Sequence, residues 1–63
     1  MSREISRSIV VASQKPDYYY TINHSNNMIT VGLMENGHTI QEIKIPIGDA
    51  VGVGRAILDI LPR

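Results

Sequence analysis

Between residues 18 and 47, apolar side chains recur at every second position, which is the period of a β-strand. Three such runs, at residues 18–24, 28–34 and 39–47, are separated by short segments that contain Asn and Gly. An earlier run at residues 5–12 is rich in β-branched residues and ends before a turn-forming Gln-Lys-Pro-Asp cluster. The pattern therefore predicts four strands joined by short turns.

Each of the three later runs has one apolar side. The expected core side consists of Tyr18, Tyr20 and Ile22 in the second run, Ile29, Val31 and Leu33 in the third, and Ile43, Ile45 and Ile47 in the fourth. Tyr19, Thr21 and Asn23 lie on the opposite side of the second run. The three consecutive tyrosines are the only aromatic residues of the chain. The alternation divides them and leaves Tyr19 alone free to face away from the core.

The length of the turn between the second and third strands follows from these faces, because a register slip of one residue would place a whole apolar set on the wrong side. A two-residue loop at Asn26-Asn27 places Ile22 opposite Val31, which keeps both apolar sets together. Asn also tolerates the positive φ that a type I′ turn requires. We therefore predict a two-residue hairpin loop here.

The turn between the third and fourth strands is predicted to be longer. A two-residue loop at residues 36–37 would oppose Val31 to Glu42 and would mix the two faces. A three-residue loop at residues 35–37, with a bulge, instead opposes Ile29 to Ile43. The preferred interpretation is the three-residue loop.

After residue 47 the period changes to that of a helix, which we predict over residues 50–61. Gly48-Asp49 is the expected N-cap, and Pro62 ends the helix. Gly52 and Gly54 lie inside it, and each should be about 1 kcal/mol less favourable than Ala. Close approach of this helix to the sheet, or to a second copy of the chain, is the expected reason for both glycines.

The fold class is therefore α+β, a single small domain over residues 1–63 in which a four-stranded antiparallel sheet is followed by one C-terminal helix (ββββα). A chain of this length buries only about 60% of the surface that it exposes when unfolded. It contains no cysteine, so disulfides cannot compensate. One short helix cannot cover both faces of the sheet, and we expect dimerisation to complete the fold.

Charge and composition restrict the function. The formal net charge is zero, which argues against a strong non-specific nucleic-acid binder. Arg3, Arg7 and Lys15 outnumber Glu4 in the first 16 residues, so a mildly positive edge is expected there. The chain has no apolar signal segment and no run near the ~18 apolar residues of a membrane span, which favours a cytoplasmic protein.

No pattern of residues indicates catalysis, a cofactor or a metal. Neither His24 nor His38 has a partner at metal-ligand spacing, and no Ser has a recognisable base. The segment at residues 48–55 joins a strand to a helix like a phosphate-binding loop, but its glycine spacing fits neither the dinucleotide fingerprint nor the P-loop. We therefore expect a protein that is not an enzyme.

One group of residues has a chemistry that fits a ligand. Flat rings on a sheet stack on unpaired bases, cations neutralise phosphates, and Asn or Thr side chains bind base edges. The candidate nucleic-acid-binding residues are Arg7, Lys15, Tyr19, Thr21, Asn23 and Lys44. The alternative for the ring is that Tyr19 packs against Met34 across the hairpin and is covered by a second subunit.

The order of features from Arg7 to Leu61 resembles the PUR repeat, the ββββα unit of Pur-alpha-like single-stranded nucleic-acid-binding proteins, whose topology is also similar to that of the Whirly proteins. Lys15 and the tyrosines that open the second strand match that family, as does the Asn-containing turn. Met28 and Thr30 stand where the family typically has basic residues. The resemblance implies a homodimer with packed helices whose sheets bind single-stranded DNA or RNA.

The alternative function is a small protein-protein interaction or regulatory module, such as an accessory protein of a mobile element. In that case the partner would dock on the apolar residues of the outer sheet face. These are Val10, Tyr19, Met28, Met34 and Ile40.

Overall fold

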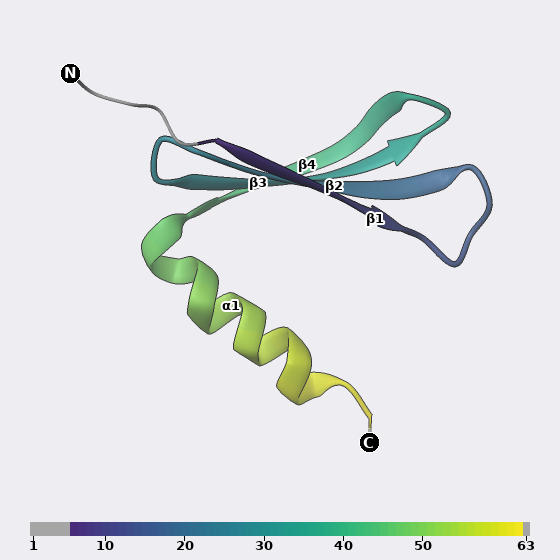
Figure 1. Ribbon diagram of the computed structural model, residues 1–63. Helices are drawn as coiled ribbons and strands as arrows, with labels where there is room; N and C mark the ends of the chain where they lie inside the picture. Colours follow the sequence, from purple (N-terminus) through teal and green to yellow (C-terminus); the bar gives the residue numbers. More distant parts are fainter. Residues whose placement is uncertain (1–5, 63) are drawn as a thin grey trace.

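The computed structural model describes residues 6–62 and consists of one antiparallel sheet followed by one helix (Figure 1). The strands are β1 (Arg7–Ala12), β2 (Tyr18–Ser25), β3 (Met28–Glu35) and β4 (His38–Pro46), and the helix is α1 (Ile47–Ile60). The strands lie side by side in chain order. This confirms the predicted ββββα fold. Arg3 and Glu4 lie outside the described residues.

The turn between β2 and β3 has the predicted length and register. Ile22 pairs with Val31, and Tyr20 pairs with Leu33. Asn26 and Asn27 both have left-handed backbone conformations, with φ of 53° and 64°. Asn adopts this region more readily than other residues that carry a Cβ, which explains why the two-residue turn forms.

Replacing Asn27 by Ala is expected to lower the free energy of unfolding by about 1 kcal/mol, because Ala is strained at positive φ. Replacement by Gly, which adopts this region freely, is expected to leave stability within about 0.5 kcal/mol of the parent. Urea unfolding at one fixed protein concentration measures both changes. Equal stabilities for the Ala and Gly variants would contradict this account of the turn.

The predicted three-residue loop between β3 and β4 is wrong. Glu35 pairs with His38, so the loop is the two-residue turn Asn36-Gly37. The register then shifts by one residue at Leu33/Met34, and Ile40 is the extra residue of this bulge. The shift brings Val31 opposite Ile43. The predicted pairing of Ile29 with Ile43 is therefore also wrong, because Ile29 pairs with Ile45. The bulge inside β4 still places apolar residues opposite one another.

The predicted helix start is also wrong, because α1 begins at Ile47 with Pro46 as its N-cap residue. The Ile47 amide donates a hydrogen bond to the carbonyl of Asn27 at 2.9 Å, which ties the start of the helix to the β2–β3 turn. Asp49 is not the cap but lies in the first turn, where its negative charge interacts favourably with the positive end of the helix dipole. No helix of the described chain is long and apolar enough to span a membrane.

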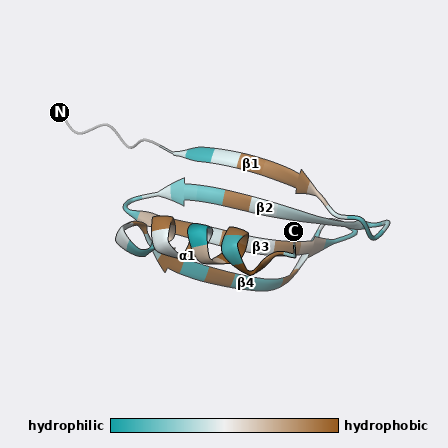
Figure 2. Ribbon diagram, turned by 90° about the horizontal axis from the view of Figure 1, so that it is seen from below, coloured by the Kyte–Doolittle hydropathy of each residue, from teal (hydrophilic) through white to brown (hydrophobic). Residues whose placement is uncertain are grey.

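The helix lies on the apolar side of the sheet. Figure 2 shows α1 in front of β3 and β4, the two strands that it contacts, and Figure 1 shows that its C-terminal end points away from the sheet. By alternation and register, this helix-side face consists of Arg7, Ile9, Val11, Tyr18, Tyr20, Ile22, His24, Ile29, Val31, Leu33, Glu35, His38, Gln41, Ile43 and Ile45.

Within residues 6–62 no hydrophobic side chain is buried, and Gly32 is the only buried residue. The sheet and the helix together therefore form an apolar layer without a closed core.

The expected close approach of α1 to the sheet at its glycines is not found. A Cβ added to Gly52 or Gly54 would meet no atom of the described chain within 4 Å, and the same holds for Gly48. The packing of the single chain therefore gives no reason for glycine at these positions. The other expectation, a second copy of the chain, remains.

Candidate nucleic-acid interface

The sheet face opposite the helix carries most of the candidate ligand-binding residues. This outer face consists of Ser8, Val10, Ala12, Tyr19, Thr21, Asn23, Ser25, Met28, Thr30, Gly32, Met34, Thr39, Glu42, Lys44 and Pro46. It is more polar than the helix-side face. Its side chains come from all four strands, so their spacing is fixed by the hydrogen-bonded sheet.

One row of this outer face is polar from edge to edge. The register aligns Ser8 with Asn23, Asn23 with Thr30, and Thr30 with Lys44. The Ser8 hydroxyl donates a hydrogen bond to Oδ1 of Asn23 at 2.6 Å. This bond fixes the Asn23 side chain and leaves its amide NH₂ free to donate to a ligand.

A second row contains the aromatic residue. Tyr19 lies between Ala12 of β1 and Met34 of β3, and it is half-buried. The Thr39 hydroxyl donates a hydrogen bond to Sδ of Met34 at 3.1 Å. The cross-strand pairing of Tyr19 with Met34 is present, and the neighbour of Tyr19 on the other strand is the small residue Ala12.

Gly32 lies between these two rows, opposite Thr21 and Glu42. A Cβ built on Gly32 would lie 2.8 Å from the Thr21 hydroxyl oxygen, so the Thr21 side chain occupies this space. Sδ of Met34 would lie 3.9 Å from the same Cβ. The side chains of Thr21 and Met34 therefore cover Gly32, which is buried.

The structure separates the candidate cations. Arg7 pairs with His24 on the helix-side face, because it has the parity of Ile9 and Val11. Lys15 lies in the β1–β2 turn, with its ammonium 5.8 Å from the centre of the Tyr18 ring on that same helix side. Of the candidate set, the outer face therefore brings together Tyr19, Thr21, Asn23 and Lys44 but neither Arg7 nor Lys15.

A polar cluster that was not predicted from the sequence lies at the end of the sheet that carries the β1–β2 and β3–β4 turns. Tyr18 pairs with Glu35, and the amide of Asn36 donates to the carbonyl of Asp17 at 3.1 Å, which joins the two turns. A hydrogen bond to the Glu35 carboxylate, and then its negative charge, raise the pKa of Tyr18 above 10.0. The ammonium of Lys15 makes a cation–π contact with the ring of the same tyrosine.

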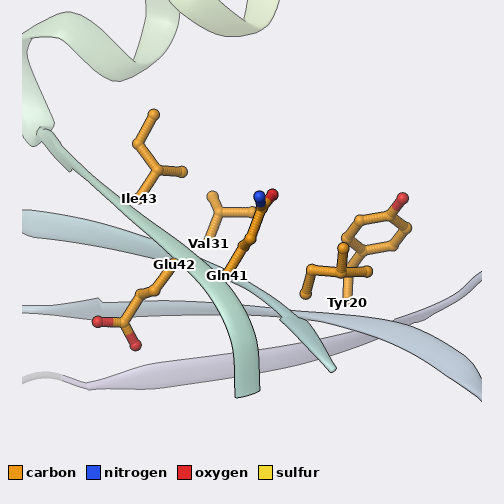
Figure 3. Close-up of a pocket in the computed structure, with 6 residues that line it drawn as sticks. Tyr20, Val31, Gln41, Glu42 and Ile43 are labelled. Carbon is orange, nitrogen blue, oxygen red and sulfur yellow. The ribbon is translucent and has the colours of Figure 1, made fainter. Parts of the chain in front are cut away.

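A groove on the helix-side face was also not predicted. It has a volume of about 690 Å³ and is lined by residues of β2, β3 and β4. Figure 3 shows Tyr20, Val31, Gln41 and Ile43 on the side of the helix, whereas Glu42 points away from it. Within the described residues there is no group of three or more His, Cys, Asp or Glu side chains that could hold a metal ion.

Comparison of the chain with known protein families, with curated proteins and with solved structures finds no match. Any assignment of function therefore depends on the geometry of the two sheet faces and of the groove.

Proposed function

We propose that this chain is a non-enzymatic protein that binds single-stranded nucleic acid on its outer face and acts as a homodimer. The observation that carries the proposal is the position of Tyr19, Thr21, Asn23 and Lys44 on one face of the sheet, with the apolar residues on the other. The apolar face is suited to self-association, which would leave the outer face in water.

Each side chain of this group has a distinct part in the proposed complex. The Tyr19 ring stacks on one unpaired base, which contributes about 1 to 3 kcal/mol. The Asn23 amide and the Thr21 hydroxyl bind base edges, and Lys44 pairs with a phosphate. Glu42 lies in the next row and opposes the phosphate charge, so we expect a modest affinity per copy. Two copies on one strand would bind more tightly through a higher effective concentration.

A protein partner on the outer face is the second candidate. Val10 is 67% exposed there and Met28 is 37% exposed, so this face also offers apolar contact area. The substitutions Met28→Asp and Met34→Asp would abolish the capture of such a partner. This alternative requires that the parent protein has no affinity for nucleic acid.

Titration of labelled single-stranded DNA and RNA, at low and at moderate salt, tests the proposal. We expect binding that weakens with salt. Lys44→Gln is expected to reduce the slope of log K against log salt by about 0.7 for each copy that loses a phosphate contact. Lys15→Gln is the matched control, because it removes one positive charge that does not lie on the outer face. Its expected effect on the slope is much smaller. Absence of binding at low salt, or equal effects of the two substitutions, would contradict the proposal.

A further inference from the structure

The single chain exposes more surface than a folded protein of its mass. Its accessible area is 5625 Å², against about 4,000 Å² expected for a folded monomer of 7.0 kDa. The difference of about 1,600 Å² exceeds the ~800 Å² that one partner contributes to a standard interface. The radius of gyration is 13.4 Å, whereas about 11 Å is typical for this length.

Apolar side chains of the helix-side face and of α1 make up much of this exposed surface. Ile43 is 58% exposed in the groove, and Leu58 is 70% exposed on the helix. The other exposed apolar residues of this layer are Ile9, Val11, Tyr20, Ile47, Val51, Val53, Ile57, Ile60 and Leu61. The helix and the apolar face of the sheet lie on the same side of the molecule (Figures 1 and 2).

The apolar surface of α1 extends beyond the side that faces the sheet of the same chain. Ala50 and Gly54 are the only half-buried residues of the helix, so they mark the side nearest the sheet. At 100° per residue, Ile57 lies about 40° and Leu58 about 60° from the mean direction of these two residues, whereas Arg55 lies about 120° from it. A Cβ added to Gly54 would meet no atom within 4 Å, so space remains between this part of the helix and the sheet.

We propose that a second copy of this chain covers the helix-side face, and that each α1 packs into the groove of the other copy. The groove residues Val31 and Ile43 of one copy then contact Ile57 and Leu58 of the other, and the reverse contacts follow by two-fold symmetry. The result is one shared core. This inference specifies the interface of the proposed homodimer, and it does not depend on nucleic-acid binding.

A second copy fits this surface for three reasons. The surface supplies both an apolar groove and an apolar helix, which is the self-complementary arrangement that a two-fold interface requires. The formal net charge is zero, so two copies approach without net repulsion. The excess area is large enough for a stable homodimer, and these interfaces resemble a domain core divided between the partners.

Isotope-filtered NOE spectroscopy tests the contacts directly. Labelled and unlabelled chains are mixed, unfolded and refolded together, so that a fraction of the dimers contains one of each. We expect cross-peaks from the methyl groups of Ile57 and Leu58 on one copy to those of Val31 and Ile43 on the other. A monomeric mass, or intermolecular cross-peaks from the outer face alone, would overturn the proposal.

A pair of helix substitutions gives a second test. Leu58→Asp places a charge in the proposed interface and is expected to weaken dimerisation by at least about 100-fold. Arg55→Asp introduces the same side chain on the polar side of α1 and is expected to change it by less than about 10-fold. Equal effects would contradict the proposed interface.

The two proposals can fail separately. A dimer that binds neither single-stranded DNA nor RNA would contradict nucleic-acid binding but not the interface. A monomer that binds one of them would contradict the interface and the homodimer but not nucleic-acid binding.

Discussion

Replacement of Val11 by Asp is expected to prevent folding at micromolar concentration, whereas replacement of the adjacent Val10 by Asp is expected to be tolerated. In the single chain both side chains are exposed, Val11 to 42% and Val10 to 67%. Val11 lies on the helix-side face beside Tyr20, which the second copy would cover, and Val10 lies on the outer face. An uncompensated charge in such an interface costs several kcal/mol, a large part of the roughly 5–15 kcal/mol that stabilises a small domain.

Circular dichroism and thermal unfolding of the two variants, at one protein concentration, measure this difference. The substitutions introduce the same residue into adjacent positions of the same strand, so strand propensity and charge are matched. Equal melting temperatures for the two variants would show that neither face is covered. A larger loss for Val10→Asp would show that the outer face is the covered one.

Replacement of Tyr19 by Ala is expected to lower the affinity for single-stranded DNA by roughly 10-fold or more, because stacking of one base contributes about 1 to 3 kcal/mol. Tyr19→Phe keeps the ring and is expected to retain affinity within a factor of about 3 of the parent. Fluorescence anisotropy with a labelled oligonucleotide measures both variants.

Tyr20→Phe is the control for this experiment, because Tyr20 lies on the opposite face of the same strand. Its affinity for single-stranded DNA is expected to equal that of the parent. An unchanged affinity of Tyr19→Ala, or equal losses for Tyr19→Ala and Tyr19→Phe, would contradict a stacking role for this ring.

Alternation and turn chemistry were enough to predict the sheet and its two faces. Tyr18 and Tyr20 lie on the helix-side face and Tyr19 on the outer face, because side-chain direction in a strand depends only on position parity. The Asn26-Asn27 turn was predictable because one residue of slip would have separated Ile22 from Val31. The β3–β4 turn was not, because a bulge at Ile40 and a longer loop both align the apolar rows.

The outer face carries only part of the candidate set, because Arg7 and Lys15 do not lie on it. Arg7 has the same parity as Ile9 and therefore lies on the helix-side face, a result that the alternation of β1 already contained. Lys15 lies in a turn, where alternation gives no direction, and its ammonium lies over Tyr18. The groove on the helix-side face was not predictable. An apolar pattern indicates that residues are buried, but not whether the same chain or another one covers them.

Sedimentation equilibrium of the parent protein over a range of micromolar concentrations tests whether one chain supplies only half of a hydrophobic core. We expect a mass twice the 7.0 kDa of one chain, and a thermal midpoint that rises with protein concentration. A cooperatively folded species of 7.0 kDa at every concentration would contradict this expectation.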